Sequence, residues 1–280
     1  MLSTKSGIDS FACHDTLVKR LCQVSLLVLL ILPTGQGASA DEKPRNPVVP
    51  SDNVGALATL DAPAEDQSRV PADINKEFLS PDLNPEEWLK RFEIESREVF
   101  AGRKSVIRAI GLKKGSAIAD VGSGTGLYLG LFSREVGESG RVYAVDISPR
   151  LIEHIQRRVK ADELNNVRVI QSEEKSARLL PESVDFVFVC DTYHHFEYYP
   201  EMLQSIRAGL KPGGQLVLVD FNRIPGVSRD WLLTHVRAGK GTVKDEVVAA
   251  GFEFVEEVKI PEFHENYFLR FRRPTASSEE

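Results

Sequence analysis

Hydrophobic and polar positions along the chain follow one another as expected for alternating strands and helices. Residues 117–126, AIADVGSGTG, predict a buried strand that runs straight into a glycine-rich loop, because Ala117, Ile118, Ala119 and Val121 can pack between helices on both faces of a parallel sheet. Three more strands are predicted at 141–147, 166–172 and 184–196. The LKPGG segment at 210–214 predicts the turn before a fifth strand, since proline cannot continue a helix and glycine supplies turn conformations.

The last predicted elements lie towards the C-terminus. A helix is predicted over 240–252, and the apolar residues on or near one of its faces are Val243, Val247, Val248 and Ala250. Gly251 would end this helix. Alternating residues at 252–258 and 266–271 predict two further strands. Their short connection contains Pro261 and no predicted helix, which favours a hairpin.

The glycine-rich loop has the chemistry of a nucleotide-type binding site. Gly122, Gly124 and Gly126 let the backbone turn sharply and approach a ligand without an intervening Cβ. The helix that follows would direct its unpaired N–H groups and its positive dipole end at that ligand. Asp146 ends the second strand about twenty residues after the loop, where a carboxylate can accept hydrogen bonds from ribose hydroxyls. A dinucleotide fingerprint would have a third glycine where this chain has Leu127, which weakens a nicotinamide interpretation.

Together these motifs resemble the class I S-adenosylmethionine-dependent methyltransferases over residues 91–272. The resemblance implies an α/β fold with a doubly wound, mostly parallel seven-stranded sheet of the Rossmann-like methyltransferase type and one antiparallel strand. It implies S-adenosyl-L-methionine as the cofactor, with Asp120 facing the methionine ammonium and Asp146 holding the ribose. The family often has an acidic residue near the adenine amino group, where this chain has Ser172 followed by Glu173. The predicted cofactor-binding residues are Asp120, Gly122, Ser123, Gly124, Gly126, Asp146, Ile147, Ser172, Glu173 and Asp191.

Candidate catalytic residues follow the fourth strand, where open α/β folds bind their ligands. His194 or His195 can act there as a general base that removes a proton from the acceptor during methyl transfer, because histidine titrates near neutrality. The alternative is that both histidines orient the loop by hydrogen bonds. Asp191 and Tyr193 are similar candidates. Positioning alone can supply much of the acceleration, since the sulfonium is already activated.

Other polar residues allow more than one interpretation. Glu197, Tyr198 and Tyr199 either line the acceptor pocket or form a solvated loop. His235 and Arg237, which precede the last predicted helix, are expected to be structural or surface groups.

The composition and charge of the chain exclude some classes of binding partner. Hydrophobic residues make up 42% and charged residues 27% of the 280 residues, which is ordinary for a protein with a folded core. The net charge of −6 and the absence of a basic cluster argue against nucleic acid as a partner. No spacing of cysteines and histidines indicates a metal site. We therefore expect a small-molecule acceptor. A quinone, a lipid, another metabolite and a protein side chain remain open, as does the oligomeric state.

The first forty residues have the pattern of a secretory signal peptide. Lys19 and Arg20 precede an apolar run at 21–32, and Ala38-Ser39-Ala40 forms an A-x-A cleavage site. We expect cleavage after Ala40 and export of the mature chain to the periplasm or the medium. The alternatives are an uncleaved anchor that leaves the protein on the membrane, or a misassigned start and a cytoplasmic protein.

The remaining organisation follows from composition and helix signals. The predicted segments are a signal peptide (1–40), a flexible proline-rich linker (41–74), an N-terminal helical segment that packs on or covers the core (75–110), a methyltransferase domain (111–273) and a disordered tail (274–280). Asn84 would cap a helix that starts at Pro85. The side chains expected to pack against the sheet domain are Trp88, Phe92, Val99 and Phe100.

Three functions are compatible with the sequence. The first is an enzyme that moves a methyl group from S-adenosylmethionine to a small-molecule acceptor by in-line displacement. The second is a non-catalytic cofactor-binding module, which export favours because the cofactor is made in the cytosol. The third is an NAD-dependent oxidoreductase, which would share the loop and Asp146 but lacks the third glycine spacing. The complete set of loop glycines and strand-end carboxylates favours the enzyme.

Overall fold

The computed structural model describes residues 70–71 and 73–275. The predicted signal peptide, the predicted linker up to residue 69 and the predicted tail from residue 276 lie outside the described residues. None of the helices in the described part of the chain is long and apolar enough to cross a membrane.

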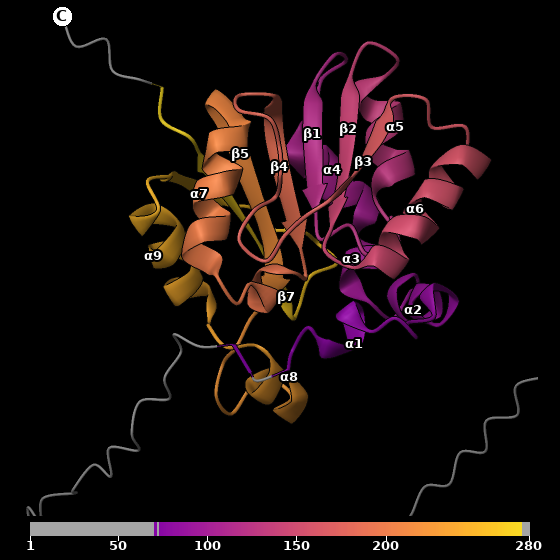
Figure 1. The fold of residues 1–280 in the computed structure, drawn as a ribbon. Helices are drawn as coiled ribbons and strands as arrows, with labels where there is room; N and C mark the ends of the chain where they lie inside the picture. The colour runs from indigo at the N-terminus through magenta and orange to yellow at the C-terminus, as the bar shows by residue number, and fades with distance from the viewer. Residues whose placement is uncertain (1–69, 72, 276–280) are drawn as a thin grey trace, which may run out of the picture. The chain divides into compact units, whose positions relative to one another are not determined.

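Seven strands form one sheet in the order β3-β2-β1-β4-β5-β7-β6 (Figure 1). Strands β1 to β5 pair in parallel, and β7 is antiparallel to both of its neighbours, β5 and β6. The predicted Rossmann-like methyltransferase fold, its single antiparallel strand and the C-terminal hairpin are therefore confirmed. The strands are β1 (Ala117–Val121), β2 (Arg141–Asp146), β3 (Val167–Gln171), β4 (Val184–Cys190), β5 (Leu210–Phe221), β6 (Glu253–Glu257) and β7 (Asn266–Arg272).

Helices cover both faces of this sheet. Apolar side chains of α4, α5 and α6 join one hydrophobic core, and those of α7 and α9 join the other. Strand β1 contributes to both, because Ile118 lies in the first core and Ala119 in the second, as the alternation of a strand requires. The helices are α1 (Lys76–Leu79), α2 (Pro85–Phe92), α3 (Glu98–Ala101), α4 (Arg103–Ile110), α5 (Leu129–Val136), α6 (Pro149–Ala161), α7 (Tyr199–Gly209), α8 (Asp230–His235) and α9 (Lys240–Ala249).

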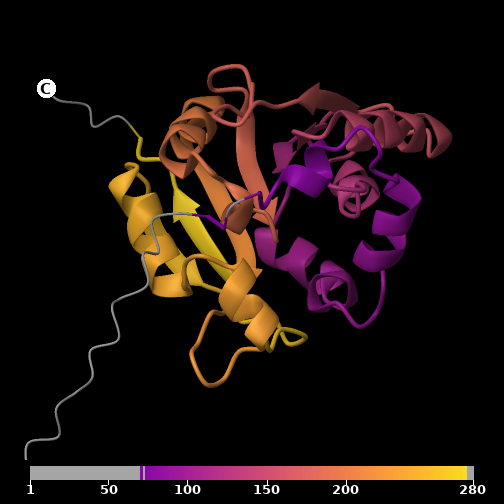
Figure 2. The same cartoon turned by 60° about the horizontal axis from the view of Figure 1, so that its bottom comes forward.

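Helices α1, α2, α3 and α8 lie together at one end of the sheet, beyond the carboxyl ends of the parallel strands (Figures 1 and 2). The cap predicted for α2 is present, since the Asn84 side chain accepts a hydrogen bond from the N–H of Glu86 at 3.1 Å. Segments far apart in the sequence therefore meet where open α/β folds bind ligands.

The LKPGG segment was predicted as a turn but lies within β5. Leu210 pairs with Val184, and the pairing of β4 with β5 then shifts register before Phe186. Gly213 takes up this irregularity with a φ of +78°, so the chain passes through the segment without leaving the sheet.

Two other predicted features are wrong in detail. The fourth strand ends at Cys190 instead of residue 196, because Asp191 has a φ of +46° and Tyr193–His195 form a 3₁₀ turn. On α9, the Val243 side chain is buried but that of Val248 is 44% exposed. The apolar face of this helix is therefore narrower than the valine spacing predicted.

Candidate cofactor and acceptor site

The loop after β1 is fixed to β2 by hydrogen bonds. Gly122 has a φ of +79°, and a Cβ there would lie 2.2 Å from Cγ2 of Thr192. The N–H groups of Gly122 and Ser123 donate to the carbonyl of Val145 at 2.8 and 3.0 Å. The Ser123 hydroxyl donates to the carbonyl of Asp120 at 2.7 Å. Thr192 therefore occupies the space that a side chain at position 122 would need.

The other two loop glycines also have positive φ, but only one of them borders open space. A Cβ on Gly124 would lie 3.3 Å from the Phe92 ring, and Gly124 lines the cavity described below. A Cβ on Gly126 would lie 2.9 Å from Cδ1 of Leu129. Gly126 is not among the cavity-lining residues, so the structure gives it the role of turning the chain into α5.

Two buried carboxyl groups lie where β1 and β2 end. Asp146 accepts hydrogen bonds from the N–H groups of Gly124 at 2.8 Å and Ser148 at 2.9 Å. Burial raises the pKa of Asp146 to about 6, against the lowering effect of these hydrogen bonds. Burial and the nearby Asp146 together raise the pKa of Asp120 to about 8. Within the described chain the Asp120 carboxyl group has no hydrogen-bond partner, which leaves it available to an ammonium or hydroxyl group of a ligand.

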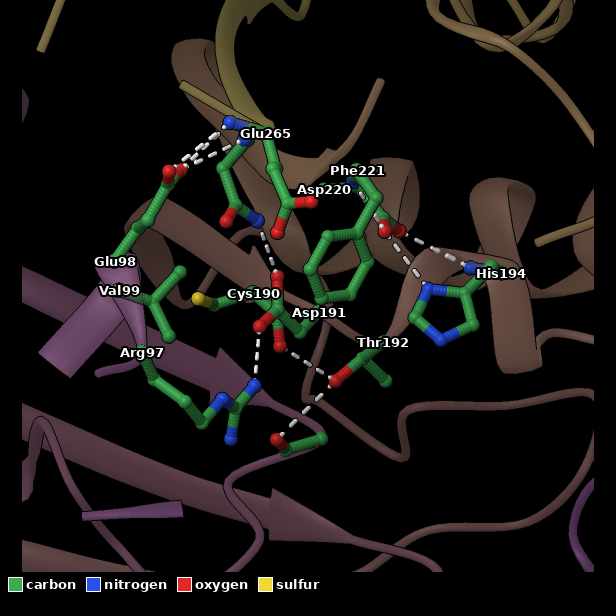
Figure 3. A network of polar contacts seen from close by, with 12 residues as sticks. Arg97, Glu98, Val99, Cys190, Asp191, Thr192, His194, Asp220, Phe221 and Glu265 are labelled. Atoms are coloured by element: carbon green, nitrogen blue, oxygen red, sulfur yellow. Dashed lines mark hydrogen bonds and ion pairs between the residues drawn. The ribbon is translucent and has the colours of Figure 1, made fainter. Parts of the chain in front are cut away.

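Asp191 joins the helical segment to the last strand (Figure 3). Its carboxylate forms an ion pair with Arg97 and accepts a hydrogen bond from Nδ2 of Asn266 at 2.8 Å. Burial raises the pKa of Asp191 to about 6, although the guanidinium of Arg97 acts in the opposite direction. Each carboxylate oxygen has a protein partner, so Asp191 holds the wall of the site together at the position where we predicted a cofactor ligand.

Two glutamates fix the helical segment over the glycine loop. Glu93 pairs with Arg158 and accepts a hydrogen bond from the Thr125 hydroxyl at 3.2 Å. The Glu98 carboxylate accepts hydrogen bonds of 2.9 to 3.0 Å from the backbone N–H groups of residues 264–266. These contacts cross from α2 and α3 to α6, to the loop and to the β6–β7 connection.

A cavity of about 770 Å³ lies at the carboxyl ends of the parallel strands, within the range of about 300–1,000 Å³ that is typical of ligand sites. The predicted cofactor residues that line it are Asp120, Gly122, Ser123, Gly124, Asp146, Ile147, Ser172, Glu173 and Asp191. Its aromatic lining consists of Phe78, Trp88, Phe92, Tyr128, Phe196, Phe221 and Trp231, together with three histidines. The cavity therefore combines a polar, glycine-rich wall with a wall of ring side chains.

Both predicted catalytic histidines line this cavity. Nδ1 of His194 lies 2.7 Å from Oδ1 of Asp220 (Figure 3), and Nδ1 of His195 lies 3.1 Å from Oδ1 of Asn75. Burial and the neighbouring histidines lower the pKa of His195 to about 2, so this ring is neutral. His235, expected to be structural or a surface group, lies beside them as a third cavity histidine.

Several cavity residues were not predicted as such. Trp88 and Phe92 were expected to pack against the sheet domain, but α2 lies beyond the strand ends and directs both rings to the cavity. Val99 does pack into the core as predicted. The four-residue spacing of two aromatic side chains on a polar helix was a signal for this position. Neither spacing nor periodicity could have placed Trp231, because α8 reaches the cavity through tertiary folding.

The remaining polar residues considered in the sequence differ in whether they line the cavity. Glu197 lines the cavity and accepts a hydrogen bond from Nδ2 of Asn75 at 2.9 Å, whereas Tyr198 and Tyr199 are not among its lining residues. Arg237 is buried and makes two hydrogen bonds of 2.7 Å to Glu246, so it is structural as expected.

Comparison with known proteins gives consistent matches. Residues 118–214 match the family model described as a methyltransferase domain. Demethylmenaquinone methyltransferase from Listeria welshimeri is 29% identical over 126 residues, which are 44% of this chain and 53% of that protein. The Geobacillus stearothermophilus enzyme of the same name is 28% identical over 130 residues, 46% of this chain and 56% of that protein. The crystal structure of a SAM-dependent methyltransferase from Aquifex aeolicus aligns with a TM-score of 0.59 at 27% identity, covering 68% of this chain and 98% of that one.

Residues 118–214 thus form a methyltransferase domain, and the sheet around them has the fold of such enzymes. In this domain and in its sheet topology the chain is similar to the class I S-adenosylmethionine-dependent methyltransferases. The matched segment spans about half the length of the curated relatives, 53% for the Listeria protein.

Proposed function

We propose that this protein transfers a methyl group from S-adenosylmethionine to a small ring-containing acceptor in the 770 Å³ cavity. One observation carries the proposal: a single cavity joins the glycine loop and two strand-end carboxyls to a wall of aromatic side chains. The methyltransferase domain at residues 118–214 and the likeness to a SAM-dependent methyltransferase structure support the cofactor. The names of the Listeria and Geobacillus relatives specify a quinone as their substrate, which supports a ring compound as the acceptor.

The cofactor wall fits S-adenosylmethionine by its chemistry. The Asp120 carboxyl group lines the cavity with no partner in the described structure and is suited to the methionine ammonium. Asp146 has two backbone N–H donors already and keeps further lone pairs for ribose hydroxyls. Ser172 and Glu173 line the same wall, where an adenine amino group would find acceptors.

The aromatic wall would orient the acceptor. When bound, S-adenosylmethionine supplies a methyl group already activated by its sulfonium sulfur. A nucleophilic atom of the acceptor would form the new bond to the methyl carbon while the carbon–sulfur bond breaks and leaves its electron pair on sulfur, and the proton of the acceptor would pass to solvent. Rings such as Phe92 and Trp231 would hold a planar acceptor in line with that bond and exclude water, which supplies acceleration by positioning.

An acceptor screen tests the proposal. The full chain is incubated with S-adenosylmethionine and hydroquinones, phenols, thiols or amines, and formation of S-adenosylhomocysteine and of methylated product is measured. We expect turnover with a ring hydroxyl or ring carbon acceptor. Replacement of Trp231 by Ala should raise the KM for the acceptor with little change in cofactor affinity, whereas Val227→Ala, at a residue that is 77% exposed, should change neither. Cofactor binding without transfer to any class would instead support the non-catalytic module.

A further inference from the structure

Three histidines form a cluster on the cavity wall. One ring nitrogen from each of His194, His195 and His235 can be chosen so that all three lie within 4.8 Å of one another. The ring centroids are 4.4 Å apart for His194 and His195, and 5.1 and 5.3 Å from these two rings to His235. All three side chains line the cavity.

Hydrogen bonds at Nδ1 orient the rings of His194 and His195. Asp220 accepts a hydrogen bond from Nδ1 of His194 at 2.7 Å, so Nε2 is the ring nitrogen left for a ligand (Figure 3). The Asn75 amide donates to the carbonyl of His195 at 3.0 Å and to Glu197 at 2.9 Å. Its oxygen therefore accepts from Nδ1 of His195 at 3.1 Å, which again leaves the lone pair on Nε2. Imidazoles oriented through Nδ1 in this way have the second-shell arrangement found around metal-binding histidines.

The third ring is placed by stacking. His235 lies on Trp231 with ring centroids 4.8 Å apart and an angle of 20° between the planes. Among the described residues, neither nitrogen of the His235 ring has a hydrogen-bond partner.

We propose that His194, His195 and His235 bind a divalent transition-metal ion of the zinc type, with an open coordination position towards the cavity. Three imidazole ligands and one exchangeable position are the composition of a catalytic zinc site, and imidazole also suits Fe²⁺, Co²⁺, Ni²⁺ and Cu²⁺. Tetrahedral coordination places ligand nitrogens about 3.4 Å apart. Small rotations of the rings would close the cluster from its present maximum of 4.8 Å.

The open position would take an anionic oxygen or sulfur of the acceptor. A metal ion lowers the pKa of a bound hydroxyl or thiol group, so the nucleophile would form without a free histidine base. Asp220, which is buried beside His194, would offset part of the ion's charge. This use of the metal rests on the proposed methyl transfer, whereas metal binding itself does not.

Titration of the full, metal-free chain tests the site. Zn²⁺ alone is followed by calorimetry and Co²⁺ alone by visible absorption. We expect one ion per chain, with the intense cobalt bands of a four-coordinate, nitrogen-rich site. His194→Ala, His195→Ala and His235→Ala should each weaken binding at least tenfold. Asp220→Asn should weaken it by about 10–100-fold through the orientation of His194.

His264→Ala is the matched control, because His264 lies outside the cluster and should leave metal binding unchanged. Circular dichroism and S-adenosylmethionine affinity establish that each variant is folded. Zn²⁺ binding of equal strength in the wild type and all three cluster variants would overturn the proposal, as would the absence of binding to the wild type. Both outcomes are independent of methyl transfer. A protein that binds Zn²⁺ through the cluster yet methylates no acceptor would retain the metal site and lose only its proposed use.

Discussion

Asp120 is a carboxyl group that the fold removes from water without giving it a hydrogen-bond partner among the described residues. Burial of a lone carboxylate is costly, and the group responds by retaining its proton. Its pKa of about 8 follows from burial and from Asp146 nearby. A cationic ligand would remove much of this cost, so a destabilising feature of the free protein becomes a favourable contact on binding.

The raised pKa makes stability depend on pH. Between its ordinary value of 3.8 and the folded value of about 8, Asp120 binds more protons in the folded than in the unfolded state. Its contribution to the unfolding free energy therefore falls as pH rises through this range. Asp146 acts in the same direction only up to about pH 6.

Asp120→Asn should therefore stabilise the free protein more at pH 8 than at pH 6. Urea unfolding of wild type and variant at both pH values measures this difference. A difference in unfolding free energy that does not change with pH would show that Asp120 does not titrate in this range.

Substitution of Gly122 tests whether the loop after β1 needs a glycine at this position. Gly122 and Gly111 have similar φ angles of +79° and +75°, but an added Cβ meets Thr192 at 2.2 Å only at Gly122 and no atom within 4 Å at Gly111. Gly111→Ala should cost about 1–2 kcal/mol, the strain of a left-handed backbone. Gly122→Ala should cost more in thermal unfolding and should also weaken cofactor binding. Equal losses in the two variants would mean that Thr192 moves aside easily.

The helical segment is the element that completes the site. Contacts from Glu93, Arg97 and Glu98 tie it to three different parts of the sheet domain. Helices α1 and α3 have only four residues each, too short to be stable alone. The order of α3 must therefore come from these cross-links and from the packing of Val99. The order of α1 comes from contacts such as those of Asn75 with His195 and of Phe78 with Trp88.

Glu98→Ala removes the acceptor of three backbone N–H groups. We expect faster amide exchange in α3 and in residues 264–266, with the sheet core unaffected. Glu95→Ala, on the same segment but 73% exposed at its side chain, should leave exchange unchanged. If protection of residues 264–266 survives in the Glu98 variant, the carboxylate does not hold these two parts together.

Prediction from the sequence was strongest for elements with a local pattern. The strand and loop at 117–126, the Asn84 cap and the C-terminal hairpin follow from burial, capping and chain length, and all three are present. The failures depend on tertiary contacts. His235 joins a pair of histidines about forty positions earlier in the chain, and LKPGG stays in the sheet because Leu210 pairs with Val184. No periodicity within one segment could indicate either contact.

At the scale of the whole molecule, the first forty residues carry the prediction of its cellular location. The charged start, the apolar run at 21–32 and Ala38-Ser39-Ala40 predict export and a mature chain that begins at Asp41. N-terminal sequencing of the protein from fractionated native cells measures this. A cytoplasmic species that retains residues 1–40 would contradict the prediction. An exported enzyme would in turn need a supply of its cofactor outside the cytosol.

Calorimetric titration with S-adenosylmethionine, S-adenosylhomocysteine and NAD tests the central claim most directly. The account predicts that the wild-type chain binds the first two and not NAD, and that Asp146→Ala loses about 1–3 kcal/mol of binding free energy. Asp185→Ala is the control, because Asp185 also accepts a backbone N–H, from Ala117 at 2.7 Å, but lies at the opposite end of the strands. Binding of NAD in place of S-adenosylmethionine, or equal S-adenosylmethionine affinity in the wild type and the Asp146 variant, would contradict the account.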